Sequence, residues 1–554
     1  TAVKPSKTLT TTNMKLNLAF LLATVATASL TPPSRHEIKS LPGWINDDST
    51  SAALPSKMFT GYLDAGTPPS GVGTMYFHYW LVESERDPTT DPVLIWYNGG
   101  PGASSLFGLL QEWGPLRLLE TSYDENYNKT GIPTPQFNPY RWTKTHTVVA
   151  IDSPPPMGLS FCSEAGPAGN ATSCGPWTDK SVFKANHAAH RTLFTSVFPE
   201  LAANPVYFTG ESYAGIYLPG FANEMMMDPI PNVNFQGWAI GDGWTGCVPV
   251  AGKPPNWCID LDNVGMFKYP NVEPGPYYDV EYFHGHSQFS NSLYRDIQST
   301  CTQAELKGTE DMPEACQALI QQMADEVGLF FAYNLYNACP SGTMATKAVQ
   351  DKHGANQALR SRRQWLKSFQ YGVAGNLNPK GGDSSGLSSP CLGNAMNDWF
   401  LLPETLAAIG APNNSAFINL DNGHGFDYTS DQTFVGPIYE KAIKAGLNIL
   451  VYEGDVDACG LQTSNVEDVF VPLFDGIMNK TQRWRPWTTD GYKSMGGYVI
   501  EWAHRNAQFV SVRGSGHLVP LNRPHVSEVM MNAFTQGKPL PAINVDPPPS
   551  AGEL

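Results

Sequence analysis

Five short apolar runs, each ending in turn residues, constrain the fold of this 554-residue chain more than any other feature of its sequence. They are nearly continuous and rich in valine, isoleucine, tyrosine and phenylalanine, which is typical of strands buried on both faces of a parallel sheet. The runs are DPVLIWYNGG (91–100), THTVVAIDSP (145–154), NPVYFTGES (204–212), LNILVYEGDVD (447–457) and AQFVSVRGSGH (507–517). The sequence therefore predicts a mostly parallel central sheet.

Helix-like segments lie between these runs, for example at residues 181–198 and 403–411. Alternating strands and helices predict an α/β doubly wound architecture, with helices flanking the sheet. In such sheets, ligands bind beyond the carboxyl ends of the strands. The turn residues that end the five runs are therefore the first candidates for chemistry.

The first part of the chain contains a predicted signal peptide at residues 14–28. MKLNLAFLLATVATAS begins at Met14, an apolar stretch follows Lys15, and Ala26-Thr27-Ala28 forms a cleavage site. The apolar stretch is shorter than the ~20 residues that span a bilayer, which disfavours a transmembrane helix. We expect a secretory-pathway protein, secreted or vacuolar/lysosomal, with no membrane segment after signal removal.

The rest of the chain divides into a core that is interrupted by an insertion. The insertion, residues 246–390, holds five of the nine cysteines and helix-like stretches at 312–328 and 356–372. We expect it to form a helical cap stapled by disulfides, because so long a structureless loop would be unusual in a compact protein. The core then comprises residues 29–245 and 391–540, and a Pro-rich tail, 541–554, is expected to be disordered.

Charge and short motifs exclude some functions and suggest modifications. The net charge of −16 argues against nucleic-acid binding, which needs a basic face. The cysteines lack the paired C-x-x-C spacing of a zinc site, and we expect neither a metal nor a cofactor. In a secreted chain, N-x-S/T motifs are credible glycan acceptors. They occur at Asn128, Asn170, Asn413 and Asn479.

Ser212 lies at a tight strand-to-helix corner within FTGESYAGIYLPG (208–220). This pattern, here G-x-S-x-A, is the nucleophile elbow of α/β-hydrolases, in which small neighbours let strand and helix approach. That fold supplies the nucleophile, the acid and the base in the chain order Ser, Asp, His. Asp457 and His517 follow in this order, with Asp455 as the rival acid. The sequence thus predicts an α/β-hydrolase fold with a catalytic triad.

An oxyanion hole needs backbone N–H groups close to the serine. The glycine-rich turn NGGPGASS (98–105) follows an early strand, where this fold supplies one donor. We therefore expect the N–H groups of Gly100 and Tyr213 to be the donors. The alternative is that NGGPG is a plain surface turn.

Four motifs, in this order, resemble the serine carboxypeptidases: WYNGGPGASS, TGESYAGIYLP, GDVD and GSGHLVP. Five further stretches fit the same family: LPGW (41–44), FTGYL (59–63), FHYWLVESERDP (77–88), FNPYRW (137–142) and FPE (198–200). The resemblance covers most of the mature chain. It implies an enzyme that releases single residues from the free C-termini of peptides and proteins, mostly at acidic pH, with Ser212, Asp457 and His517 as its triad.

The resemblance also implies how the free carboxylate of a substrate is read. In this family the task falls to residues that match Asn98, Gly99, Glu112 and Glu211. Two adjacent carboxylates repel each other, so we expect a shared proton in acid. The alternative for Glu211 is a solvated residue at a helix start.

This chain departs from the family pattern at several positions. Ala103 replaces a cysteine whose usual partner matches Cys391, Leu518 follows the histidine, and the loop near Asp152 and Met157, expected to face the substrate, differs. Some members carry a reactive cysteine after the triad acid, which predicts a free thiol at Cys459. We expect four disulfides, although connectivity cannot be read from sequence. They are Cys162–Cys174, Cys247–Cys258, Cys301–Cys316 and Cys339–Cys391.

Other functions stay open at this stage. An acyltransferase on the same scaffold would keep the triad and pass the acyl group to an alcohol. A general esterase would not need Asn98, Glu112 and Glu211. A non-catalytic protective protein would not need an intact triad. The preferred C-terminal residue and the oligomeric state, monomer or homodimer, are not determined by the sequence.

Overall fold

The computed structural model describes most of the predicted core and part of the insertion. The described residues, all within the unit Pro33–Leu554, are 34–45, 53–249, 258–260, 276–307, 310–328, 333–336, 394–420, 426–458, 463–491 and 494–543. Several predictions fall outside them: the signal peptide, the helix-like stretch 356–372, most of the tail, and the cysteines at 339, 391 and 459.

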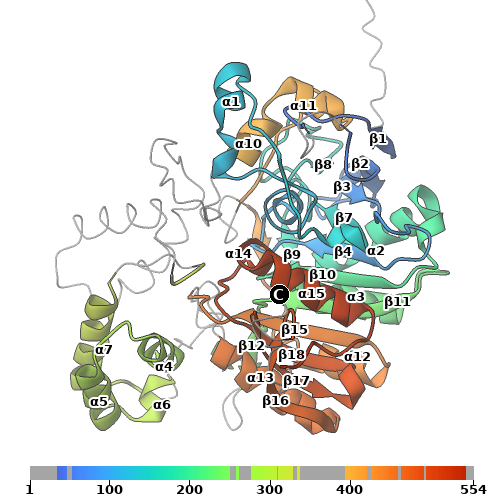
Figure 1. Ribbon diagram of the computed structural model, residues 1–554. Coiled ribbons are helices and arrows are strands. Elements are labelled where there is room, and N and C mark those ends of the chain that lie inside the picture. Colours follow the sequence, from blue (N-terminus) through green and yellow to red (C-terminus); the bar gives the residue numbers. More distant parts are fainter. Residues whose placement is uncertain are drawn as a thin grey trace, which may run out of the picture. The chain divides into compact units, whose positions relative to one another are not determined.

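A twelve-stranded mixed sheet forms the centre of the fold (Figure 1). In spatial order it contains β1 (His36–Ile38), β2 (Met58–Asp64), β3 (Met75–Val82), β7 (Thr147–Ile151), β4 (Val93–Tyr97), β10 (Val206–Glu211), β11 (Phe235–Gly241), β15 (Asn448–Gly454), β18 (Ala507–Val512), β17 (Met495–Trp502) and β16 (Lys480–Thr488), with β8 (Phe161–Cys162) paired to β3. The six strands from β7 to β18 are parallel to one another. Each strand outside them pairs antiparallel with its neighbours. All five predicted strands belong to this parallel centre.

The parallel strands are buried on both faces because helices cover both. Along β4, Val93, Ile95 and Tyr97 pack in one apolar cluster with α2, α3, α12 and α13. Leu94 and Trp96 pack in a second cluster with α10, α11 and α15 on the opposite face. This two-sided burial explains why the strand reads as a continuous apolar run. The predicted α/β-hydrolase fold is confirmed.

The helices lie between the strands and in the inserted region. They are α1 (Glu125–Thr130), α2 (Asp179–Thr192), α3 (Ala214–Met227), α4 (Tyr277–Gly285), α5 (Asn291–Thr300), α6 (Gln303–Leu306), α7 (Glu314–Val327), α10 (Ala395–Phe400), α11 (Pro403–Ala408), α12 (Gly436–Lys444), α13 (Thr463–Ile477), α14 (Val519–Asn522) and α15 (Pro524–Thr535). Two π-helical turns are η1 (Gly108–Glu112) and η4 (Leu193–Val197). The predicted helix 181–198 is thus an α-helix that ends at Thr192 and continues as η4.

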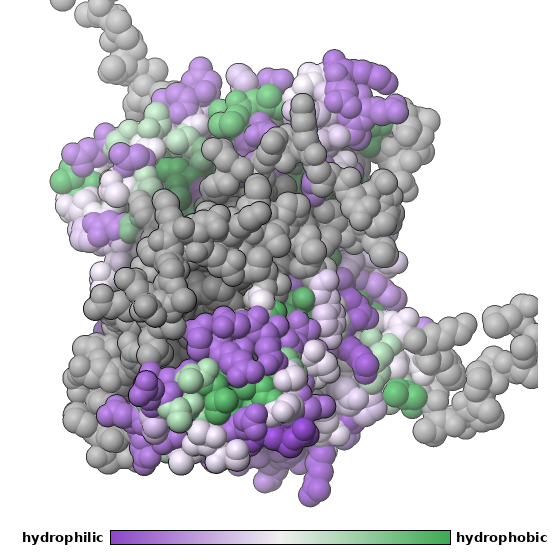
Figure 2. Space-filling model, turned by 90° about the vertical axis from the view of Figure 1, so that its left-hand side faces the viewer, coloured by the Kyte–Doolittle hydropathy of each residue, from purple (hydrophilic) through white to green (hydrophobic). Residues whose placement is uncertain are grey.

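The inserted region contains α4 to α7 and the short hairpin β12 (Cys247–Pro249) and β13 (Cys258–Asp260). Its helices share an apolar cluster that also includes Val456 and Ala458. Helix α5 buries Leu293 and Ile297 and exposes mainly polar side chains. Figure 2 shows the side of the molecule on which α5 and α7 lie in Figure 1, and the described part of this surface is mainly hydrophilic with smaller apolar areas.

Two of the expected disulfides lie within the described side chains and are present. Cys162 bonds Cys174, and Cys301 bonds Cys316, which joins the end of α5 to α7. The side chains of Cys247 and Cys258 lie outside the described part. All four predicted glycan acceptors, Asn128, Asn170, Asn413 and Asn479, are exposed. Among the described residues, no helix is both long enough and apolar enough to cross a bilayer.

Candidate active site

Ser212 occupies a strained corner between β10 and α3. Its φ angle is +61°, a left-handed conformation that residues with a side chain adopt at a cost of about 1–3 kcal/mol. Small neighbours make the corner possible. A Cβ on Gly210 would lie 2.4 Å from the carbonyl oxygen of Tyr97, and one on Gly215 would lie 2.2 Å from that of Trp244. The corner therefore has the geometry of a nucleophile elbow.

His517 and Asp457 form a buried hydrogen-bonded pair. The distance from His517 Nδ1 to Asp457 Oδ2 is 2.7 Å, and the side chains are 4% and 0% exposed. With Nδ1 engaged, Nε2 is the nitrogen available to take a proton from a hydroxyl group. Asp455, the rival acid, instead accepts a hydrogen bond of 2.6 Å from the N–H of Gly514. The structure thus favours Asp457 as the partner of the histidine.

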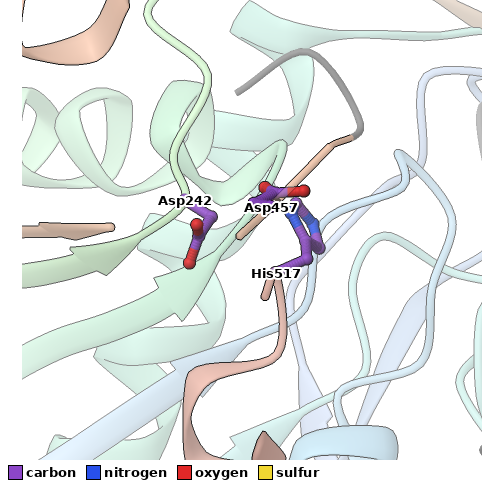
Figure 3. Close-up of side chains that lie close together, drawn as sticks. All are labelled: Asp242, Asp457 and His517. Atoms are coloured by element: carbon purple, nitrogen blue, oxygen red, sulfur yellow. Dashed lines mark hydrogen bonds and ion pairs between the residues drawn. The ribbon is translucent and has the colours of Figure 1, made fainter. Parts of the chain in front are cut away.

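The elbow and this pair lie at the carboxyl ends of three strands in the parallel centre of the sheet. Ser212 follows β10, Asp457 follows β15 and His517 follows β18, with β11 between the first two. The N–H of Ser212 donates to the carbonyl oxygen of Gly241, the last residue of β11. The side chain of the next residue, Asp242, offers an oxygen that lies within 4.8 Å of ligating atoms of both Asp457 and His517 (Figure 3).

Asp242 was not among the predicted site residues. It is fully buried, has a φ of +44°, and accepts a 2.9 Å hydrogen bond from the N–H of Gly454. Burial, followed by the negative charges of Glu453 and Asp457, raises the pKa of Asp242 well above its ordinary value. The three side chains could ligate a metal, but Asp457 and His517 already bond each other. We therefore interpret the group as an acid–base cluster.

The glycine-rich turn approaches the elbow closely. A Cβ on Gly99 would lie 2.4 Å from the backbone nitrogen of Tyr213 and 2.8 Å from Cβ of Ser212. Gly100 follows with a φ of +111°, and its N–H has no hydrogen-bond partner in the described part of the chain. The turn is therefore packed against the residues that flank the serine and is not a plain surface turn.

Tyr213 is fixed by a buried network that the sequence did not reveal. Its hydroxyl group donates to Asp179 Oδ1 at 2.8 Å and lies 2.5 Å from Ser430 Oγ. Asp179 accepts three more hydrogen bonds, from the hydroxyl of Tyr428 and the N–H groups of Asp431 and Gln432. This network fixes the side chain of the residue whose N–H is the second predicted oxyanion donor.

Asn98, Glu112 and Glu211 meet beside the elbow, all at least 96% buried. Asn98 Nδ2 donates to Glu211 Oε1 at 2.8 Å, while Asn98 Oδ1 accepts from Trp96 Nε1 at 2.7 Å and from the N–H of Gly108. The acceptor bonds fix the orientation of the Asn98 amide. Glu112, at the end of η1, adjoins Glu211. The alternative of a solvated Glu211 is therefore wrong.

The two carboxyl groups favour a shared proton. Burial raises the pKa of Glu112 to about 8, although a hydrogen bond with Glu211 acts in the opposite direction. Burial also raises the pKa of Glu211 well above its ordinary value, and the negative charge of Glu112 adds to the rise. Two ionised carboxylates this close repel each other, and a hydrogen bond can form between them only if one is protonated. The pair therefore retains a proton in acid.

Asp152 and Met157, expected in a loop facing the substrate, are both buried. Asp152 accepts hydrogen bonds from the hydroxyl of Ser104 at 2.5 Å and from the N–H of Ser105, and it also bonds His78 Nδ1 at 3.0 Å. Its carboxylate therefore supports the end of the glycine-rich turn from inside the protein.

A model of the family described as serine carboxypeptidase matches residues 49–537. The lysosomal protective protein of Mus musculus is 29% identical over 548 residues, covering 94% of this chain and 98% of that protein. The serine carboxypeptidase ctsa-4.1 of Caenorhabditis elegans is 27% identical, with the same coverage. A prohormone-processing carboxypeptidase from Saccharomyces cerevisiae has a similar fold, with a TM-score of 0.56 and 17% identity over 90% of this chain and 95% of that chain.

Proposed function

Because this chain belongs to the serine carboxypeptidase family, we propose that it releases single residues from free peptide C-termini through an acyl-enzyme on Ser212. A serine-type carboxypeptidase acts on peptide or protein substrates. The assignment of its steps to particular residues is our inference. It rests mainly on one observation: a buried carboxyl pair, whose Glu211 accepts a hydrogen bond from Asn98, adjoins the elbow that carries Ser212.

In the acylation step, Ser212 Oγ attacks the carbonyl carbon of the last peptide bond. His517 Nε2 takes the hydroxyl proton, while the bond to Asp457 fixes the imidazole orientation and stabilises its charged form. The N–H groups of Gly100 and Tyr213 donate to the oxyanion. When the C–N bond breaks, His517 returns the proton to the leaving amine, and the C-terminal amino acid departs.

Deacylation repeats these roles with water as the nucleophile. His517 takes a proton from the water while the water oxygen attacks the ester carbonyl, and Ser212 leaves with that proton. The products are the shortened peptide and a free serine hydroxyl. A peptidase and an acyltransferase differ only in the group that attacks in this second step.

The carboxyl pair explains why the last residue is selected. Glu211 and Asn98 adjoin the elbow, and Glu112, next to Glu211, is completely buried. A protonated pair donates a hydrogen bond to the substrate carboxylate, whereas an ionised pair would repel it. Asn98, Gly99, Glu112 and Glu211 thus form the proposed carboxylate site.

A comparison of two peptides tests this function. The peptides share one sequence, and one ends in a free acid while the other ends in an amide. The free acid should lose residues one at a time in acid, the amide should react far more slowly, and Ser212→Ala should process neither. Equal rates for both peptides, or internal cleavage, would contradict the proposal.

We further propose that the protein matures in the secretory pathway and acts in a secreted or vacuolar/lysosomal compartment. The predicted signal at residues 14–28, the two disulfides and the exposed acceptors Asn128, Asn170, Asn413 and Asn479 support this location. Residues 246–390 are the proposed cap, between core parts 29–245 and 391–540.

A further inference from the structure

Four residues of the inserted region, Tyr333–Tyr336, touch both loops that carry the acid and the base. The N–H of His517 donates to the carbonyl oxygen of Tyr333 at 2.8 Å. The N–H of Leu335 donates to the carbonyl oxygen of Val456, next to Asp457, at 2.9 Å. The Leu335 side chain is buried in the same apolar cluster as Val456. One short segment is thus hydrogen-bonded to the backbone of His517 and to the residue next to Asp457.

The segment also fits tightly against the loop before His517. A Cβ on Gly516 would lie 2.0 Å from the carbonyl oxygen of Tyr333, so only glycine allows this approach. Asn334 Nδ2 donates to Asn522 Oδ1 at 3.2 Å, and the same oxygen accepts from the N–H of Gly516. The backbone of the histidine loop and the inserted segment therefore share one hydrogen-bonded network.

The ring of Tyr333 lies flat on the imidazole of His517. The ring centroids are 4.9 Å apart, and the planes differ by 20°. A contact with the ring face restricts rotation of the imidazole about its last side-chain bond. The contact is made with the ring face, whereas both nitrogens lie on the ring edge: Nδ1, which bonds Asp457, and Nε2, the proposed base for the serine hydroxyl.

We propose that Tyr333 is a positioning residue for His517, holding the imidazole in the plane in which it bonds Asp457 and faces Ser212. This role rests on the proposed function of the triad. It also gives the inserted region a part in the chemical step. The planar ring is the part of Tyr333 that matters, since the ring face makes the contact with the imidazole.

The test compares four substitutions in this segment. Tyr333→Met keeps apolar volume but loses the planar face, and Tyr333→Leu serves as a second variant if the first does not fold. Tyr333→Phe keeps the ring. Tyr336→Met is the matched control, because Tyr336 is 65% exposed and its ring contact is with His286 rather than with His517.

Two kinetic measurements follow, with the melting temperature recorded for each protein. The first is the rate at which a small fluorophosphonate labels Ser212, which needs the base but no substrate carboxylate. The second is kcat and KM for a blocked dipeptide acid. Tyr333→Met should lower the labelling rate and kcat by roughly tenfold, with KM within about twofold, as expected for weaker support of a general base.

Tyr333→Phe and Tyr336→Met should both stay within about twofold of the wild type. A labelling rate in Tyr333→Met equal to that of the wild type would overturn the proposal, as would an equal defect in Tyr336→Met. If the labelling pattern appears but no protein releases C-terminal residues, the proposed carboxypeptidase function fails while the role of Tyr333 stands.

Discussion

The pH dependence of substrate binding should reveal the carboxyl pair of Glu112 and Glu211. The perturbation is Glu211→Gln, studied with a blocked dipeptide acid and the amide of the same dipeptide. In the wild type, only the protonated pair donates to a substrate carboxylate. In the variant, the amide of residue 211 donates at every pH and can still accept from Asn98.

The size of the effect follows from the pKa of Glu112, about 8. If loss of one proton at this pH abolishes binding, KM for the acid should rise about twofold between pH 5 and 8 and roughly tenfold by pH 9. The direction is fixed by charge, because a rising pH adds a negative group opposite the substrate carboxylate. The amide has no carboxylate, so its KM should stay nearly constant.

The assay is initial-rate kinetics with ninhydrin or mass-spectrometric detection of the released residue or its amide. Active enzyme is counted at each pH by fluorophosphonate titration, so that a loss of folded protein does not enter KM. The Glu211→Gln profile for the acid should be clearly flatter over the same range, because residue 211 then donates at every pH while Glu112 still ionises. This comparison separates binding from the chemical step, which appears in kcat.

Identical KM profiles for the acid and the amide in the wild type would refute this reasoning. A Glu211→Gln profile as steep as that of the wild type would do the same. Either result would mean that another group reads the C-terminus.

Two further predictions concern the same site. Glu112→Gln should raise the melting temperature at pH 7 but not at pH 4.5. The pKa of Glu112 is raised in the folded protein, so the protonated carboxyl group contributes its full share to the free energy of unfolding below the ordinary pKa of about 4.5. This contribution is lost as pH rises towards 8, and the loss reaches roughly 3 kcal/mol by pH 7. Gly99→Ala should lower the labelling rate of Ser212 on the order of 10²-fold, because the added Cβ would lie 2.4 Å from the nitrogen of Tyr213 and would push the turn away. Gly285→Ala is its control, because an added Cβ there meets nothing within 4 Å.

The sequence predicted the parallel centre of the sheet better than its margins. The five predicted strands at this centre are buried on both faces and read as continuous apolar runs. Strand β16 (Lys480–Thr488) lies at the edge, and its polar residues and Pro486 interrupt any apolar pattern. Strands β2 and β3 contain motifs that fit the family pattern, but their sequences were not predicted as strands. Edge and antiparallel strands depend on partners that a local pattern does not show.

The sequence predicted those site residues that directly follow a predicted strand. Ser212, Asp457 and His517 all end apolar runs, and the structure brings these strand ends together. Asp242 carried the same signal, since it follows the run FQGWAIG, but Gly237 and Gln236 weakened that run. Asp455 and Asp457 could be separated only by their hydrogen bonds.

Contacts between segments that are distant in the sequence could not be predicted from local sequence patterns. Tyr333 stacks on His517, and Asp179 bonds both Tyr213 and Tyr428, across large separations along the chain. Such pairs form because the fold brings their backbones together, and no spacing rule for helices or strands encodes them. A raised pKa for this pair was expected from like charges alone, and the structure adds burial as the larger cause for Glu211.

The central claim, that Ser212 carries an acyl group lacking only the last residue of the substrate, can be tested in one measurement. The enzyme is mixed with a peptide of known sequence and quenched in acid within milliseconds. The protein is then digested, and the mass of the fragment that contains Ser212 is measured by mass spectrometry. The account predicts that the fragment gains, on Ser212, the mass of the peptide minus the mass of its free C-terminal amino acid. An adduct on another residue, or one that lacks several residues of the peptide, would contradict it.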